Sequence, residues 1–309
     1  MESGDVFRTR DFSYRQQYDS ALAITSAAIA RDSSDPAGYY WQASIIQLLI
    51  YDSGNKLLAD SFHALCDKAV AVARQRLSRD PSDALAHFDL GMAQLNRAEF
   101  LGWQQRPLTA FRVLLDVTPH LSAALAEDSS LADARLGIGI VEYFRACADR
   151  YTLGVSLFGS RAKAYRLVTG VADRDGPLQP AAELMLAYML KEDGDAAGAA
   201  RYCRQLLRRY PENRVAMRTM RDIYYENGDL AAALAAGNHI EQEVLRVWPA
   251  NQYALAENWI VCGKAFAGLG QKDSARTRFD RVLAWERDQA DVPWLPQYVR
   301  EAKQWRKKL

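Results

Sequence analysis

The 309-residue chain lacks the features that mark several classes of protein. Its four cysteines are 81, 56 and 59 residues apart and form no C-x-x-C pair, so no disulfide framework is indicated. Their apolar neighbours predict four buried thiols instead. No run approaches the roughly 18 apolar residues that a membrane-spanning helix needs. Lys and Arg number 39 against 38 Asp and Glu, so the net charge of +1 offers no global field for nucleic acid or an anionic membrane.

A secretory leader is also missing from the N-terminus, which is polar and has no apolar core. This indicates the cytoplasm by default, or export if a leader has been removed, so the compartment stays open. With 49% hydrophobic and 25% charged residues, the composition is that of a soluble globular protein with a sizeable core. Any partner must therefore be recognised by local features.

Catalytic and metal-binding motifs are equally scarce. The four histidines, His63, His87, His120 and His239, lie far apart in sequence and show no metal-ligand spacing. A calcium-loop start at 173–176 has its glycine two positions early and no distal Glu. The sequence around Ser156 lacks the second glycine of a nucleophile elbow. We therefore predict no catalytic residue, no metal site, no cofactor and no enzymatic activity.

The stretch GVSLFGSRAKAY, residues 154–165, comes close to a phosphate-binding loop. Gly154 and Gly159 have the required spacing, but Ser160 and Arg161 replace the Lys and Ser/Thr, and no strand precedes them. We predict a loop between two helices with Ser160 as the helix cap. Two alternatives stay open: an anion held at this helix N-terminus by Ser160 and Arg161, and an enzyme that binds a phosphate compound at 154–161.

Two periodicities run along the chain. In the first half, Asp32, Asp80, Asp128 and Asp175 fall 48, 48 and 47 residues apart. Each aspartate joins a charged run to a new apolar-periodic run, with Ser, Asp or Pro as the helix-starting signal. The repeating unit is therefore a pair of helices and a turn.

The second half repeats with a shorter period, since Ala199 and Ala233 are 34 residues apart. Small residues, glycines, a tyrosine and a closing proline mark the register there, at Ala187, Gly194, Ala199, Pro211, Tyr224, Gly228, Ala233, Gly270 and Ala275. The last unit reads W-x2-C-G-x2-F and then A-x3-F, through Trp259, Cys262, Gly263, Phe266, Ala275 and Phe279. This half resembles the tetratricopeptide repeat, a helix, turn and helix of about 34 residues. Leu90 with Gly91 supplies a similar pair upstream, where the resemblance is degenerate.

The resemblance implies an all-α solenoid of antiparallel helix pairs with a concave groove. We expect one superhelical domain over 1–309, with enlarged repeats at 14–179, typical repeats at 180–290 and a capping helix at 291–309. The capping segment carries an apolar stripe, made of Leu295, Tyr298, Val299, Ala302 and Trp305.

The resemblance also implies a non-catalytic interaction module that binds a peptide or protein partner on the concave face. In the register set by Ala199, Ala233 and Ala275, the polar groove positions are Tyr188, Lys191, Arg218, Asp222, Tyr225 and Lys264. We expect Arg218, Lys191 and Lys264 to engage carboxylates or backbone carbonyls of the partner. Alternatively, these charges form a solvated face.

The corresponding upstream positions are apolar: Phe88, Met92, Leu95, Leu136, Ile140 and Tyr143. They either pack against the long N-terminal helices or line a pocket, which gives the alternative function, a small-ligand or lipid-binding solenoid. The extension at 100–127, interrupted by Gly102 and Pro107, either forms a wall of such a pocket or fills an enlarged repeat. The identity of the partner and the oligomeric state stay open.

Overall fold

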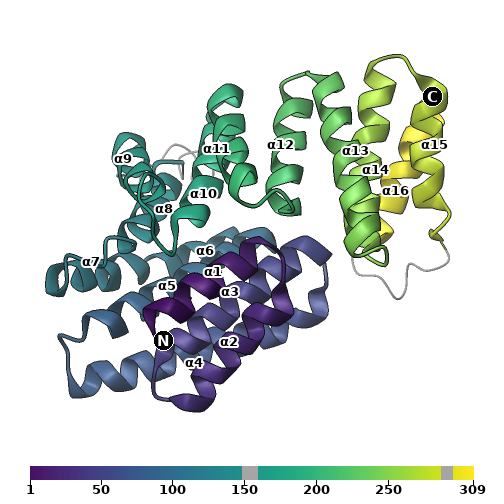
Figure 1. Cartoon of the computed structure of the whole chain (residues 1–309). Helices are drawn as coiled ribbons and strands as arrows, with labels where there is room; N and C mark the ends of the chain where they lie inside the picture. Colours follow the sequence, from purple (N-terminus) through teal and green to yellow (C-terminus); the bar gives the residue numbers. More distant parts are fainter. Residues whose placement is uncertain (148–158, 287–294) are drawn as a thin grey trace. The chain divides into compact units, whose positions relative to one another are not determined.

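The fold is built from paired α-helices, with no strand in the residues that the structure describes (Figure 1). The structure is a computed structural model that describes residues 1–147, 159–286 and 295–309. The helices are α1 Ser3–Tyr14, α2 Tyr18–Arg31, α3 Pro36–Ser53, α4 Ala59–Arg79, α5 Ala84–Trp103, α6 Pro107–Leu114, α7 Val117–Glu127, α8 Ala134–Cys147, α9 Arg161–Ala172, α10 Gln179–Glu192, α11 Ala196–Arg209, α12 Arg214–Glu226, α13 Leu230–Val247, α14 Gln252–Gly268, α15 Lys272–Leu283 and α16 Leu295–Lys308, with a 3-10 turn at Lys56–Leu58. The predicted all-α, helix-pair class is confirmed.

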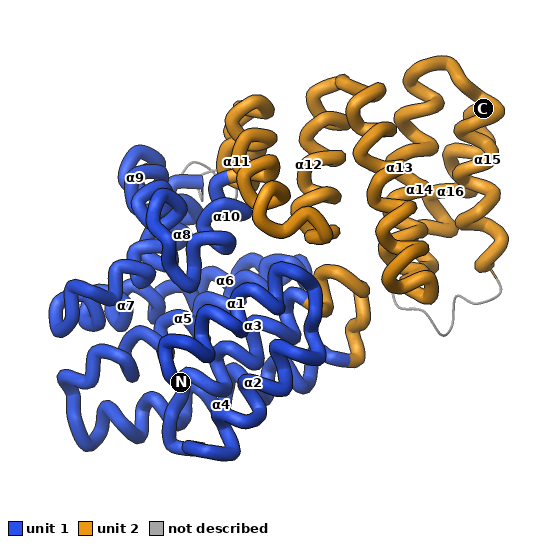
Figure 2. The backbone as a smooth tube through the Cα atoms, viewed as in Figure 1, with its two compact units in different colours: residues 1–48, 58–186 blue, residues 49–57, 187–309 orange. Residues whose placement is uncertain are grey.

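The chain divides into two compact units, which Figure 2 colours separately. Unit 1 comprises residues 1–48 and 58–186, and unit 2 comprises residues 49–57 and 187–309. The sequence predicts one superhelical domain, with a change of repeat type near residue 180. The observed division after residue 186 lies close to that change. Unit 2 also includes a short piece of chain from the N-terminal half, at the end of α3.

The 48-residue periodicity of unit 1 corresponds to the same kind of turn after α2, α4 and α7. Asp32, Asp80 and Asp128 each end a helix, and each carboxylate accepts the backbone N–H of the serine two residues later, at 2.9, 3.0 and 2.8 Å. This hydrogen bond fixes the turn that leads into the next helix. Asp175 is different, because it pairs with Arg10 at 3.1 Å.

The shorter repeats of unit 2 depend on two kinds of glycine. Gly194, Gly228 and Gly270 follow α10, α12 and α14 and have φ angles of 86°, 80° and 74°, which favour a residue without Cβ. Gly263 lies inside α14, where a Cβ would come within 2.6 Å of the Phe279 ring on α15. The helices can approach this closely only because Gly263 has no side chain. The same unit stacks Trp259 on Trp285, with ring centroids 5.0 Å apart.

The core of unit 2 continues into the last helix. α16 packs against α14 and α15 and buries Leu295, Val299 and Ala302, while Tyr298 and Trp305 are partly buried against the same cluster. Its basic residues Arg300, Lys303, Lys307 and Lys308 are exposed. This helix therefore covers apolar surface of α14 and α15 and turns a polar side outward.

Candidate functional site

The predicted polar groove positions lie on three first helices: Tyr188 and Lys191 at the end of α10, Arg218, Asp222 and Tyr225 on α12, and Lys264 on α14. We call the face that these helices contribute to unit 2 the first-helix face. Part of this face is covered by residues 49–57 of the same unit. Arg214 on α12 donates two hydrogen bonds to the Asp52 carboxylate, one of them from Nε to Oδ1 at 3.1 Å. Asn251, at the start of α14, donates from Nδ2 to the Asp52 carbonyl at 3.1 Å. One buried residue thus joins the end of α3 to two first helices.

Gly54 brings the covering segment closer still. Its φ of 65° is left-handed, and a Cβ at this position would overlap the Tyr253 ring of α14. Both the turn and the close approach therefore require glycine.

Arg218 lies beneath this segment and is buried. Its guanidinium donates to the Tyr51 carbonyl and, at 3.4 Å, to Glu257 of α14. The guanidinium carbon also lies 5.7 Å from the centre of the Tyr253 ring. Arg218 does engage a backbone carbonyl and a carboxylate, but both belong to its own chain.

A second buried arginine extends the charged network. Arg221 is fully buried and donates to the Asp222 carboxylate at 2.7 and 2.9 Å and to the Asn258 side chain at 3.1 Å. Its Nη2 also lies 3.4 Å from Glu257. Burial raises the pKa of the Glu257 carboxyl, but Arg218 and Arg221 outweigh it and hold the pKa below its usual range. The Glu257 carboxylate and the guanidinium groups of Arg218 and Arg221 therefore stay charged and hold one another in place.

The remaining groove positions reach solvent. Lys191 pairs with Glu226 at 3.0 Å, and Lys264 pairs with Glu301, with both lysine side chains partly exposed. Tyr188 is 39% exposed, whereas Tyr225 is partly buried against the cluster around Leu234. The accessible part of the first-helix face is therefore a rim of Tyr188, Lys191, Asp222 and Lys264 around a buried ionic network.

The apolar set in unit 1 forms part of the interior. Met92, Leu95, Leu136, Ile140 and Tyr143 are buried in α5 and α8. Phe88 is partly buried and meets Tyr40 edge to face, at 6.4 Å between ring centroids. A ligand could reach the buried side chains only if these helices moved apart, which argues against a ligand pocket at this place.

The extension at 100–127 contains α6 and α7. α6 packs against α5 and leaves its Leu108 80% exposed, and Leu115, directly after the helix, is 54% exposed. α7 packs against α5 and α8, and Leu121 fills the positions where Gly91 and Gly137 have no side chain. The extension therefore adds one short helix to an enlarged repeat.

Gly154 to Phe158 of the near-phosphate loop lie outside the described residues, but Gly159 to Tyr165 are described. Ser160 is the cap of α9, as predicted, and accepts the backbone N–H of Lys163 at 3.2 Å. The Glu142 carboxylate of α8 accepts the Ser160 N–H at 3.2 Å and the Lys163 ammonium at 2.8 Å. The anion at this helix N-terminus is thus a carboxylate of the chain itself.

The histidines and cysteines that the structure describes lie mainly in contacts between helices or in the interior. His87 and His120, distant in sequence, meet between α5 and α7 with 3.0 Å between their Nδ1 atoms. All four cysteines are buried, and burial raises the pKa of the Cys66 thiol to about 12. Within the described ranges, no group of three His, Cys, Asp or Glu side chains could hold a metal ion. In the same ranges, no helix is long and apolar enough to cross a bilayer.

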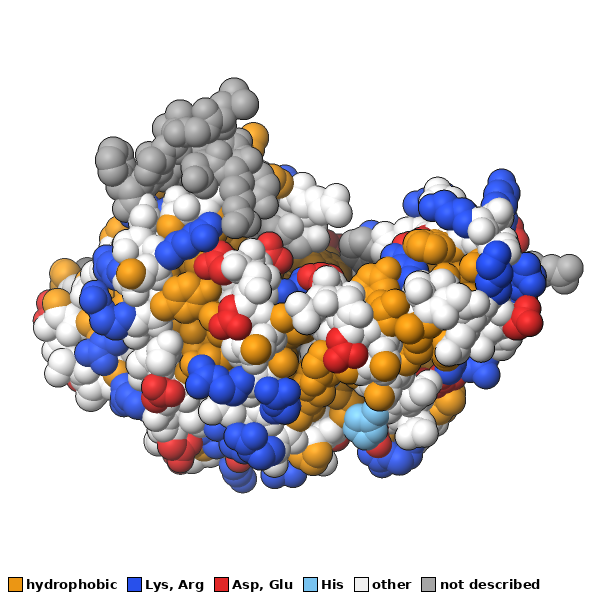
Figure 3. Space-filling model, turned by 90° about the horizontal axis from the view of Figure 1, so that it is seen from above, with side chains coloured by type: hydrophobic (Ala, Val, Ile, Leu, Met, Phe, Trp, Pro, Cys, Tyr) orange, Lys and Arg blue, Asp and Glu red, His pale blue; other side chains and the backbone are white. Residues whose placement is uncertain are grey.

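The surface shows no single field of charge on the face seen in Figure 3. Lys and Arg side chains are interspersed there with Asp, Glu and hydrophobic ones. This distribution agrees with the nearly neutral composition and favours recognition through local patches.

Comparison with known proteins identifies the fold. No protein-family model and no curated protein sequence matches the chain. Among solved structures, PilW, a type IV pilus biogenesis factor, is similar over 78% of this chain and 92% of its own, with 18% identity and a TM-score of 0.51. The Cut9–Hcn1 hetero-tetramer of the APC/C is similar over 96% of this chain and 53% of its own, with 14% identity and a TM-score of 0.55. The chain shares the helix-pair solenoid fold of these structures.

Sequence reasoning missed the central contact of the first-helix face. Asp52 and Arg214 are 162 residues apart, and no local pattern connects them. Asp52 lies in an apolar run near Gly54, which is typical of a helix end and gives no sign of a distant partner. The one available signal was the acidic residue itself, because an aspartate that is buried at the end of an apolar helix needs a cation as its partner.

Proposed function

We propose that the protein is a non-catalytic interaction module and that a peptide or protein partner binds along the rim of the first-helix face of unit 2. The observation that carries the proposal is the pairing of Lys191 with Glu226 and of Lys264 with Glu301 beside the exposed Tyr188. Such partly exposed ion pairs contribute little to stability, so a partner's carboxylates or carbonyls can replace them at small cost. Tyr188 supplies contact area that already faces solvent.

The buried network beneath the rim supports a binding role over a catalytic one. Arg214, Arg218 and Arg221 are each held by carboxylates or carbonyls of the same unit. Groups fixed in this way give the face a rigid shape, which lowers the entropy cost of binding. Among solved structures with this fold, the Cut9–Hcn1 hetero-tetramer is an assembly of more than one protein.

The test uses the full chain with a photo-crosslinking amino acid in place of Tyr188, exposed to an extract of the native host. We expect one protein to crosslink, and Lys191→Glu with Lys264→Glu to lower its recovery about tenfold. Lys307→Glu with Lys308→Glu is the matched control, because both lysines are exposed on α16 and the pair undergoes the same change of charge. A crosslinked product equally abundant in both variants would contradict the proposal.

A further inference from the structure

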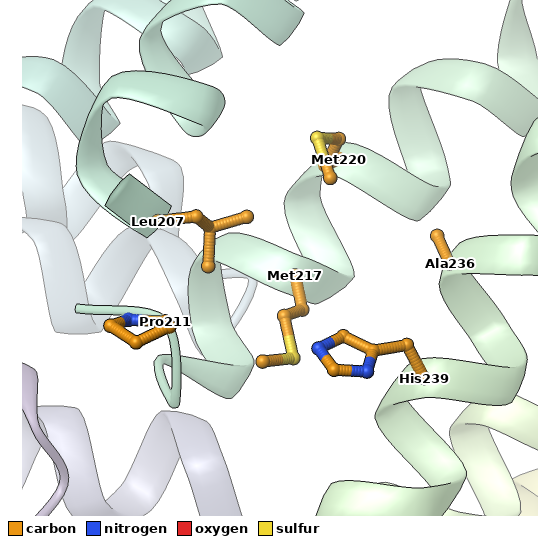
Figure 4. Close-up of a pocket in the computed structure, with 6 residues that line it drawn as sticks. All are labelled: Leu207, Pro211, Met217, Met220, Ala236 and His239. Carbon is orange, nitrogen blue, oxygen red and sulfur yellow. The ribbon is translucent and has the colours of Figure 1, made fainter. Parts of the chain in front are cut away.

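A second surface of unit 2 has the form of a binding groove. Its walls are the end of α11 and the middle of α13, and its floor is α12 (Figure 4). We call it the α11–α13 groove, lined by Leu207, Pro211, Met217, Met220, Ala236 and His239. The cavity volume is about 260 Å³, and every lining side chain except His239 is apolar.

The volume of the groove indicates whether it encloses a small molecule or receives a few side chains of a longer segment. Sites that enclose a drug-sized molecule have volumes of roughly 300–1,000 Å³. A hollow of about 260 Å³ is smaller, and Pro211 and His239 on its margins are exposed. It fits a few apolar side chains that project from a longer segment. Met217 and Met220 suit this use, because their flexible, polarisable side chains adjust to the shape of what they contact.

The helix that forms one wall of the groove, α11, carries a basic stripe. Arg201, Arg204 and Arg208 recur at spacings of three and four along α11, so they lie on one exposed stripe, and Arg204 is one turn from Leu207. α11 contains no acidic residue. Neither Arg204 nor Arg208 forms an ion pair with another residue of the part that the structure describes. On the opposite wall, Glu243 is already paired with Arg246.

We infer that the α11–α13 groove binds a peptide segment of a partner protein in which apolar side chains are flanked by Asp or Glu. The apolar side chains fill the hollow over Met217 and Met220. The flanking carboxylates meet Arg204 and Arg208, whose planar guanidinium groups bind carboxylates with two parallel hydrogen bonds. This site is independent of the rim around Tyr188, Lys191 and Lys264.

The test begins with selection of 12-residue peptides from a random display library on the folded full chain. We expect the selected peptides to combine Leu, Met or Phe with Asp or Glu. Resynthesis with Asn and Gln in place of Asp and Glu should weaken binding about tenfold, and added salt should weaken the acidic form. Neutral peptides that bind as tightly as the acidic ones would overturn the inference.

Two variants locate the binding site. Ala236→Trp fills the groove with a large side chain, whereas Ala235→Trp places the same side chain on an exposed position of α13. We expect Ala236→Trp to weaken binding at least about tenfold and the control less than about twofold. If Lys191→Glu with Lys264→Glu abolishes peptide binding and Ala236→Trp does not, the peptides bind the first-helix face. That result would support the proposed function and overturn this inference.

Methyl spectra of the unsubstituted protein keep the test decisive if Ala236→Trp does not fold. The chain has six methionines, and Met217→Leu and Met220→Leu assign the two groove signals. Addition of an acidic peptide should shift these two signals and leave the other four unchanged. Unmoved groove signals overturn the inference. So does a shift of both signals with protein concentration alone, because the groove would then bind a second copy of the chain.

Discussion

Replacement of Asp52 by Ala tests how the covering segment is held on the first-helix face. Asp52 is fully buried, and its partner Arg214 is 3% exposed. Removal of the carboxylate leaves a buried guanidinium without its counter-charge, and such a loss typically costs about 3–5 kcal/mol. We expect the free energy of unfolding of unit 2 to fall by about that amount. Urea denaturation followed by tryptophan fluorescence would measure it, with hydrogen exchange of residues 49–57 as a local readout.

A double variant separates this charge effect from the loss of packing. Asp52→Ala with Arg214→Met leaves no buried charge at this place, so it should be more stable than Asp52→Ala alone. Glu243→Ala is the control, because it breaks the exposed pair with Arg246 and should cost less than about 1 kcal/mol. A cost below about 1 kcal/mol for Asp52→Ala, or a double variant less stable than the single one, would refute the reasoning.

Three further predictions concern packing and pH. Burial raises the pKa of Asp89 to about 8, so the Asp89 carboxyl holds its proton more tightly in the folded chain than in the unfolded chain. The free energy of unfolding therefore falls as pH rises from about 4 to 8. Asp89→Asn should therefore stabilise unit 1 at pH 8 and change it little at pH 4, measured by urea denaturation; an equal effect at both pH values would contradict this. Burial, and then the charge of His87, lower the pKa of His120 in the folded chain. This contribution to stability is therefore present above about pH 6.5, the unfolded value, and is lost as pH falls through the lower pKa of the folded state. His120→Gln should make the unfolding curves at pH 5 and 7.5 more alike, and an unchanged pH dependence would argue against this role. Gly263→Ala should lower the free energy of unfolding by about 1–3 kcal/mol, because the new Cβ would press on the Phe279 ring. Gly170→Ala, in open space on α9, should raise the free energy of unfolding by about 0.5–1 kcal/mol. Melting temperatures that move in the same direction in both variants would exclude this account.

The repeating parts of the fold could be predicted from the sequence because local chemistry determines them. Asp32, Asp80 and Asp128 fix their turns through a serine two residues away. Gly228 and Gly270 mark turns that need a left-handed residue. A hydrogen bond or a φ angle of this kind depends on neighbours in sequence, so one sequence is enough to find it.

The candidate site was less predictable because it depends on contacts between distant parts of the chain. The register placed Arg218 on the first-helix face, but helix periodicity cannot show that the Tyr51 carbonyl lies against it. The upstream set shows the same limit, since an apolar position such as Leu136 reads alike whether it lines a groove or fills a core. The groove lined by Leu207 and Ala236 shows the same limit, because it depends on where α13 packs.

The inclusion of residues 49–57 in unit 2 has a consequence for how the chain is made. At roughly 5–20 residues per second, Asp52 leaves the ribosome about 8 to 32 s before Arg214, 162 residues later. During that interval the end of α3 has been synthesised without the cation that neutralises it. Unit 2 is therefore not one continuous stretch of chain. A fragment that starts at residue 187 would lack the Asp52 carboxylate that pairs with Arg214, and a peptide that spans 49–57 should restore its stability.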